Sequence, residues 1–439
     1  MDETLKRIYN AFDPSPLHKG QQALYVDLDE VRGHSGIVSH LKKKILLTNG
    51  PSCQVLTGHR GSGKSTELWQ LRQALETPTN GADRMFVVQV QADDELDRND
   101  IDFPDVLIAM IRQIAGQLRE RAGIELKPGY FKDRWQRLKE LAFSEVSLDE
   151  MELEVGMAKI TSTIRSSPES RRKIREALEP DTDNWLSAAN DIIGEAVLKL
   201  NEKGCRGLVV VVDDLDKMIT REIKDTGMLT TERLFIHRSA QLTAFKCHVI
   251  YTLPIELAYS HHDANIRRVY GGHLPVVPMT KIETPPPENK AFTPGIKKFR
   301  EIISARLTSV GAGDDVLFQS GKVRDDLIKL TGGQPTELMN FIREALVTDG
   351  LPITSQGVKR CRFELMRSYR RQLRADHWLL IEEARRTGQI ERTEGNEKAF
   401  RQLLDSRALL LYRNDEEWYG VNPAIDQLQP PASRPAGQP

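Results

Sequence analysis

Short apolar runs alternate with helical stripes along most of the chain. Runs of strand length occur at 53–57, 85–92, 207–214, 248–254 and 273–279. Between these runs, apolar residues recur at helical spacing, most clearly within 68–75, 103–118 and 186–200. Strands that alternate with helices favour a parallel sheet covered on both faces. The pattern therefore predicts an α/β fold with a five-stranded parallel-sheet core.

The segments around this core differ in character and suggest domain boundaries. Residues 1–50 form an N-terminal lead-in that includes a helix-like stretch, Ile37 to Leu47. The core is expected at 51–283, with a highly charged, partly helical insertion at about 123–182. The proline-rich connector 284–294, TPPPENKAFTP, is predicted to be rigid and extended.

The C-terminal third is predicted to be mostly helical. A small helical region, expected to act as a lid, covers 296–348. In 355–425 helices precede two apolar runs, Leu409–Tyr412 and Trp418–Val421, which bracket a polar turn. Helices followed by a hairpin are typical of a winged-helix domain. Residues 427–439 are rich in Pro, Gln and Ala and read as a disordered tail.

Bulk properties narrow the class of protein. The 439-residue chain has a net charge of −1, so nucleic acid binding would need a local basic patch. Neither a signal-peptide core nor an apolar run near the ~20 residues of a membrane helix occurs. We therefore expect a soluble, cytoplasmic protein without membrane association. The four cysteines, which lack CxxC spacing, are expected to be buried reduced thiols: Cys53, Cys205, Cys247 and Cys361.

A glycine-rich loop follows the first predicted strand and matches the pattern GxxxxGK[ST]. Glycines allow successive backbone N–H groups to turn inward around phosphate oxygens, and the N-terminus of the next helix adds a partial positive charge. Lys64 is expected to neutralise the β- and γ-phosphates, and the Ser65 hydroxyl to bind Mg²⁺. The sequence therefore predicts an ATP/ADP site with Mg²⁺, formed by Gly58, His59, Arg60, Gly61, Ser62, Gly63, Lys64, Ser65 and Thr66.

Two carboxylates follow the strand 207–212, which is rich in valine. The carboxyl ends of parallel strands form the edge at which α/β sheets bind ligands. We therefore assign Asp213 to water-mediated contact with Mg²⁺ and Asp214 to the base that activates water. A solvated acidic turn is the alternative reading.

Four further residues are weaker candidates. Thr252, at the end of the neighbouring strand, is placed to sense the γ-phosphate. Arg267 or Arg268 is a candidate arginine finger that reaches a neighbouring molecule's nucleotide. Pro335 begins a helix after Gly332-Gly333, where glycines would let the backbone approach a base or ribose. An ordinary strand threonine, surface arginines and a plain helix-entry turn are the alternatives.

Together, GHRGSGKST, VVVVDDLDK, YTLP and GGQP resemble the AAA+ and STAND branch of P-loop ATPases over roughly residues 30–425. The DDLD acids are similar to those of KAP-type ATPases. The resemblance implies that Pro335 lies near the adenine side and that the protein is a switch assembling with itself or with a separately encoded effector, plausibly in bacterial defence. The second acid is Asp214 where AAA+ proteins usually have Glu, so slow ATP hydrolysis is expected.

A DNA-acting ATPase of the origin-recognition or transposition-regulator kind is the alternative function. Eight arginines between 360 and 386 support it, because a winged helix can enter a DNA groove. Acids interleave with these arginines, as expected of a solvated helix face. We therefore expect DNA binding, if present, to be weak.

The phosphate loop makes one direct prediction. Lys64→Ala removes the only lysine of the expected phosphate cradle and should abolish ATP binding measured by calorimetry. An unchanged affinity would mean that the nucleotide binds elsewhere.

Overall fold

The computed structural model describes residues 3–33, 36–126, 161–162, 165–414 and 416–429. Most of the predicted insertion at 123–182 and of the predicted tail at 427–439 lies outside these ranges. The chain divides into two compact units. The sheet unit comprises 37–57 and 67–275, and the helical unit comprises 1–36, 58–66 and 276–439.

A parallel sheet forms the centre of the sheet unit. Its strands are β1 (Cys53–Thr57), β2 (Met85–Gln91), β3 (Gly207–Asp213) and β4 (His248–Leu253). They run in the order β1-β4-β3-β2 and all pairs are parallel. Every residue of β3 is buried, as its valine run predicts. The strand order places β4 between β1 and β3, so the carboxyl ends of all three lie at one edge.

The prediction of a fifth strand at 273–279 was wrong. This segment forms no strand, although the Thr57 amide donates to the Pro275 carbonyl at 3.0 Å. Pro275 and Pro278 lack N–H groups, so a regular ladder cannot continue along the segment. The sheet therefore has four strands in the part of the chain that the structure describes.

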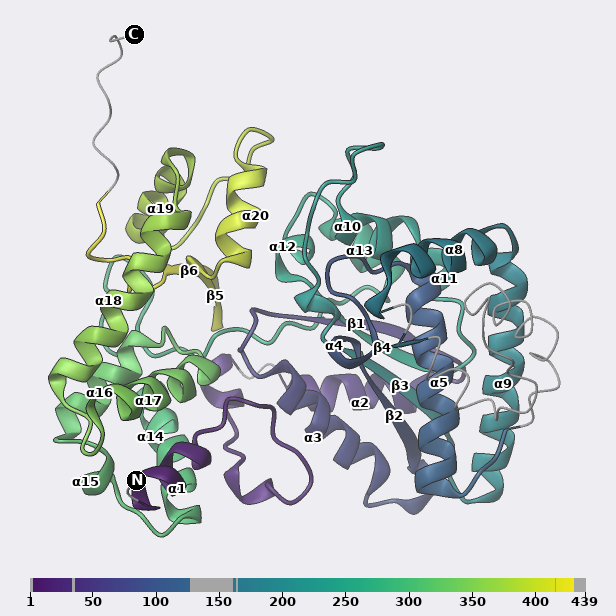
Figure 1. Ribbon diagram of the computed structural model, residues 1–439, viewed down its shortest axis with the longest axis horizontal. Coiled ribbons are helices and arrows are strands. Elements are labelled where there is room, and N and C mark those ends of the chain that lie inside the picture. Colours follow the sequence, from purple (N-terminus) through teal and green to yellow (C-terminus); the bar gives the residue numbers. More distant parts are fainter. Residues whose placement is uncertain (1–2, 34–35, 127–160, 163–164, 415, 430–439) are drawn as a thin grey trace, which may run out of the picture. The chain divides into compact units, whose positions relative to one another are not determined.

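Helices cover the sheet where the apolar stripes predict them. The helices of the sheet unit are α2 (Ile37–Leu47), α3 (Lys64–Glu76), α4 (Ala92–Glu95), α5 (Phe103–Ala122), α8 (Pro168–Leu178), α9 (Thr182–Glu202), α10 (Thr230–Glu232), α11 (Ser239–Leu242), α12 (Ile255–Ala258) and α13 (Asp263–Val269). The first three residues of α3 belong to the helical unit. Figure 1 shows α5 and α9 side by side against the sheet, consistent with their contacts to β2 and β3.

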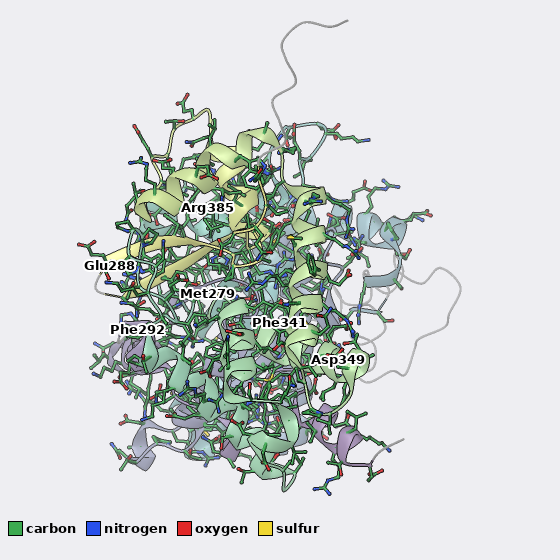
Figure 2. All side chains as sticks on the ribbon, turned by 90° about the vertical axis from the view of Figure 1, so that its left-hand side faces the viewer. Met279, Glu288, Phe292, Phe341, Asp349 and Arg385 are labelled. Carbon is green, nitrogen blue, oxygen red and sulfur yellow. The ribbon has the colours of Figure 1, made fainter. Side chains whose placement is uncertain are left out.

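The helical unit combines a helical bundle with a C-terminal hairpin. Its elements are α1 (Glu3–Ala11), α14 (Thr293–Ser309), α15 (Asp314–Leu317), α16 (Gly321–Leu330), α17 (Pro335–Asp349), α18 (Ser355–Gln372), α19 (Ala375–Thr387), α20 (Glu397–Asp405), β5 (Leu409–Asn414) and β6 (Glu416–Val421). β5 and β6 pair antiparallel, which confirms the predicted hairpin. Met279, labelled in Figure 2, packs with Leu410, Tyr412 and Trp418 in the core beneath the hairpin.

The connector at 284–294 folds back and is not extended as predicted. The Thr284 amide donates to the Lys290 carbonyl at 2.7 Å, and the Phe292 amide donates to the Ile282 carbonyl at 2.8 Å. The Thr284 hydroxyl also accepts from the Lys290 amide. These bonds across the loop outweigh the extended preference of the prolines.

The structure also bears on the expectations about the cysteines and about membrane helices. All four cysteines are free thiols, three of them buried, and burial raises the pKa of Cys53 to about 12. Within the described ranges no helix is both long enough and apolar enough to cross a membrane.

Gly333 provides a stability test of the helical unit. It has φ +77°, and a Cβ there would lie 1.8 Å from the Thr280 carbonyl oxygen. Gly20 also has positive φ, +93°, but a Cβ would meet nothing within 4 Å. Gly20→Ala should cost about 1–2 kcal/mol of backbone strain. Gly333→Ala should cost clearly more in urea unfolding, because a backbone atom must also move. Equal losses would show that the Thr280 contact is not tight.

Candidate nucleotide-binding site

The phosphate loop adopts a backbone conformation that requires its glycines. Gly58, Gly61 and Gly63 have φ values of +146°, +80° and +103°. L-residues rarely adopt such angles. A Cβ on Gly58 would lie 2.4 Å from the Val277 carbonyl oxygen, and one on Gly61 would lie 2.4 Å from Gln334 Nε2. The glycines thus serve both the turn itself and the close approach of neighbouring segments.

Lys64 is the first residue of α3 and is almost fully buried. Its Nζ donates to the carbonyls of Gly58 and His59, both at 2.8 Å. These bonds hold the ammonium group inside the loop's own curve. Ser65 and Thr66 follow on the first turn of the helix and are half-buried. A cation enclosed by the loop, at a helix N-terminus, suits bound phosphate.

His59 ties the loop to the C-terminal hairpin. Its side chain is fully buried, and Nε2 accepts a 2.9 Å hydrogen bond from the backbone amide of Leu411 on β5. Burial, reinforced by the charges of Lys64 and Arg407, lowers the pKa of His59 to about 3. The imidazole is therefore neutral at physiological pH and can accept this bond. Its long-range partner could not be found from the sequence.

Three more segments of the helical unit contact the loop. The Arg32 guanidinium donates to the Ser62 carbonyl, and Gln334 Nε2 donates to the Arg60 carbonyl. Arg60 also forms a 3.4 Å ion pair with Asp405, the last residue of α20. Sequence reasoning missed Arg32, although a lone arginine beside the apolar Leu28 and Val31 is a weak signal for a buried polar contact.

Pro335 is the first residue of α17, the position that proline favours. A Cβ on Gly332 would meet the Leu410 side chain at 2.4 Å, and Gly333 lies against Thr280. The paired glycines therefore accommodate protein segments closely. The role predicted for Pro335 beside adenine remains a prediction.

Three acids cluster at the carboxyl end of β3 in the sheet unit. Asp213, Asp214 and Asp216 place one carboxylate oxygen each within 4.8 Å of one another. Asp213 Oδ1 accepts from the Asp214 amide at 2.8 Å. Asp214 has φ +67°, which turns the chain sharply after the strand. Such an oxygen cluster suits a hard divalent cation such as Mg²⁺.

Burial, together with the charge of Asp213, raises the pKa of Asp214 to about 7. Lys217 opposes this shift because its Nζ lies 2.6 Å from Asp214 Oδ1. The same Nζ lies 2.9 Å from Asp93, which follows β2. Sequence reasoning missed Asp93. The signal was present, since Gln91 pairs with Asp213 in the sheet and Asp93 therefore follows at the same edge.

Thr252 holds the acidic turn in place. It is fully buried on β4, and its Oγ1 accepts hydrogen bonds from the amides of Leu215 at 3.0 Å and Asp216 at 3.4 Å. This support of the backbone was not foreseen. The predicted role as a γ-phosphate sensor is untested.

The two candidate arginine fingers lie on α13. Arg267 Nε donates to Asp263 at 2.8 Å, and Arg268 donates to Asn265 at 2.7 Å. Arg268 is exposed and Arg267 is half-buried. These side-chain hydrogen bonds both stay within α13, and action in a neighbouring molecule remains a prediction.

No family model and no curated protein matches the sequence. Solved structures with a similar fold include a Walker-type ATPase of Pyrococcus abyssi, 15% identical with a TM-score of 0.45, covering 94% of this chain and 98% of that one. The ORC2 protein of Aeropyrum pernix, in ADPNP-ADP complexes, is 11% identical with a TM-score of 0.43, covering 94% and 93%. Cdc6p of Pyrobaculum aerophilum is 13% identical with a TM-score of 0.39, covering 94% and 93%.

At these identities and TM-scores, the likenesses carry no conclusion about activity. The chain's own features are a parallel sheet, a GxxxxGK[ST] loop directly after β1 and paired acids directly after β3. The chain therefore has the parallel-sheet α/β fold that its pattern predicted, with the loop motif after β1 and the paired acids after β3. Nothing in the comparisons corresponds to the specific KAP or STAND features.

The raised pKa of Asp214 predicts a pH dependence of stability. The folded state retains a proton between about pH 4 and pH 7 that the unfolded state has lost, so this group makes stability fall as pH rises through that window. In EDTA, Asp214→Asn should remove the fall and be more stable than wild type at pH 8, by up to about 4 kcal/mol. Urea unfolding at pH 5 and pH 8 measures this, with the exposed Asp94→Asn as control. Parallel pH profiles for wild type and Asp214→Asn would contradict the assignment.

Proposed function

We propose that this protein is an ATP-binding and slowly hydrolysing switch of the STAND/AAA+ kind. Its ATP or ADP state would control assembly with a second copy or with a separately encoded effector. The observation that carries the proposal is the set of hydrogen bonds around the phosphate loop. Four segments distant in sequence bond to or pair with the loop, through Arg32, Gln334, Asp405 and Leu411. A change in the loop therefore reaches the hairpin and α20 directly.

The residues present suit a nucleotide with Mg²⁺. In the helical unit, the loop glycines, Lys64 and Ser65 would hold phosphates, Lys64 as a point charge and Ser65 as a hydroxyl ligand. In the sheet unit, the oxygens of Asp213 would serve the metal. The metal would neutralise charge developing on the phosphates. These roles follow the motif residue by residue.

Slow hydrolysis is proposed from the type of the second acid, which is Asp214 where AAA+ proteins usually have Glu. Burial and the charge of Asp213 raise the pKa of Asp214 to about 7, so this carboxyl can accept a proton near neutral pH. Its ion pair with Lys217 restrains it. A switch benefits from slow turnover, because the ATP state must last long enough to be read by a partner.

The γ-phosphate is the only chemical difference between the two nucleotide states. It can shift a conformational balance only by its differential affinity for the two conformations. Typical coupling of about 1–3 kcal/mol would change a population roughly 5–150-fold. That range is enough to expose or hide an assembly surface. Nothing in the described residues or the comparisons bears on a role in bacterial defence.

A DNA-acting ATPase remains the second candidate. Arg370, Arg371 and Arg386 are exposed, and none makes an ion pair or side-chain hydrogen bond within the described ranges. Other arginines of the block are engaged: Arg360 with Asp349, Arg367 with Glu364 and Arg385 with Glu382. Three available cations favour weak, salt-sensitive binding. Tight sequence-specific binding at physiological salt would favour the DNA-acting function.

The switch is tested by comparing nucleotide states of the whole protein. Asp214→Asn should retain ATP and slow its hydrolysis, so that the ATP state persists. Mass photometry and limited proteolysis with ADP, with ATP and with Asp214→Asn plus ATP should show a different mass or cleavage pattern in the ATP state. Identical results in every state would leave a constitutive nucleotide-bound scaffold.

His59 offers a matched pair of variants for the same assays. His59→Phe removes the acceptor for the Leu411 amide, so the cleavage pattern should respond little to ATP while ATP still binds. His59→Gln can supply a carbonyl acceptor and should retain more of the response. If both variants respond to ATP as wild type does, the hairpin is not coupled to the phosphate loop through His59.

A further inference from the structure

A cavity lies in the helical unit, between the N-terminal segment and the C-terminal end of α14. Its volume is about 380 Å³, within the usual range for pockets that hold small molecules. Arg7 and Asn10 of α1, His18 and Gln21 of the following loop, and Arg306 and Ser309 of α14 line it. None of the residues that contact the phosphate loop lines this cavity. The cavity is therefore separate from the candidate nucleotide site.

Arg306 is the unusual group in its wall. Only 7% of this residue is exposed. Its Nε has no hydrogen-bond partner, and Nη1 makes one long bond of 3.4 Å to the Ile302 carbonyl of its own helix. Within the described residues no carboxylate forms an ion pair with it. Burial alone lowers its pKa, to about 10.

The buried Arg171 and the half-buried Arg175 on α8 are paired with acids. Arg171, similarly buried, forms ion pairs with Asp97 at 2.9 Å and Asp100 at 3.2 Å. Arg175 is paired with Asp100 and Asp105. A buried guanidinium without a counter-charge is costly, so native proteins normally supply one. At Arg306 the chain supplies none from its described residues.

The rest of the wall also favours an anion. Arg7 adds a second guanidinium, which donates to the Val310 carbonyl. The one acid that lines the cavity is Asp13. Its Oδ1 lies 3.5 Å from Arg343 Nη1, so the arginine balances its negative charge. Asn10 is exposed and adds an amide without a partner in the described structure. The wall thus carries excess positive charge with adaptable polar groups.

We propose that this cavity binds a small acidic molecule whose carboxylate or phosphate group pairs with Arg306. The planar guanidinium fork matches either oxyanion and forms strong charge-assisted hydrogen bonds. Arg7 and Asn10 at the rim contact the remainder of the ligand. The inference does not depend on the proposed switch, since it rests on the wall of this cavity alone.

The test uses the full chain with saturating ADP·Mg²⁺, so that the phosphate loop is occupied. Thermal unfolding is measured in inorganic phosphate, in acetate and in chloride at equal ionic strength. At tenfold above its Kd, the recognised anion should raise Tm by about 2–4 °C over chloride. A rise in phosphate alone identifies a phosphate group, and a rise in acetate alone identifies a carboxylate. No rise in either overturns the proposal.

Two variants separate this site from other anion sites. Arg306→Met should lose the anion-specific rise, yet be at least as stable as wild type in chloride, because it removes a buried unpaired charge. Arg306→Lys keeps a positive charge but loses the planar guanidinium, so its anion-specific rise in Tm should be smaller than that of wild type. This variant tests the site if Arg306→Met does not fold. An undiminished rise in either variant, or a Met variant that folds but is much less stable in chloride, would contradict the proposal.

Discussion

The hydrogen bond from the Leu411 amide to His59 is the contact on which the helical unit's arrangement depends. It joins the phosphate loop to a strand more than 350 residues further along the chain. A buried amide left without an acceptor costs roughly 1–3 kcal/mol, so the neutral imidazole of His59 helps to hold the hairpin in place. Because the Lys64 and Arg407 charges and burial keep His59 neutral, the bond is insensitive to pH in the physiological range. The loop and the hairpin are thus coupled by geometry and not by titration.

In the sheet unit, the corresponding feature is the acidic turn at the carboxyl end of β3. A positive φ at Asp214 turns the chain, and the buried Thr252 hydroxyl receives the two amides that the turn exposes. Three acids then share a small volume, and Lys217, which also pairs with Asp93, balances part of their charge. Burial and the charge of Asp213 raise the pKa of Asp214, which suits a candidate proton acceptor.

The sequence predicted what depends on local pattern. The helix at Ile37–Leu47, the buried valine strand and the C-terminal hairpin were all expected from periodicity and agree with the structure. The prediction of a fifth strand was wrong because prolines at 275 and 278 remove amide donors, and hydrophobic periodicity does not take donors into account. The prediction of an extended connector was wrong because composition does not reveal hydrogen bonds across the loop, such as the one from Thr284 to Lys290. The phosphate loop itself was recognised from its glycines and lysine. Its partners Arg32 and Leu411 were not, because such contacts between distant segments leave no local signal.

Amide hydrogen exchange can measure the proposed coupling between the phosphate loop and the hairpin. Peptides that cover Leu409–Asn414 should exchange at different rates in Asp214→Asn bound to ATP and in the same protein bound to ADP. A peptide from α9, in the sheet unit, serves as the reference. The nucleotide state should change protection at Leu411, and His59→Phe should remove the difference. Equal protection of this strand in both nucleotide states, with both nucleotides bound, would contradict the coupling.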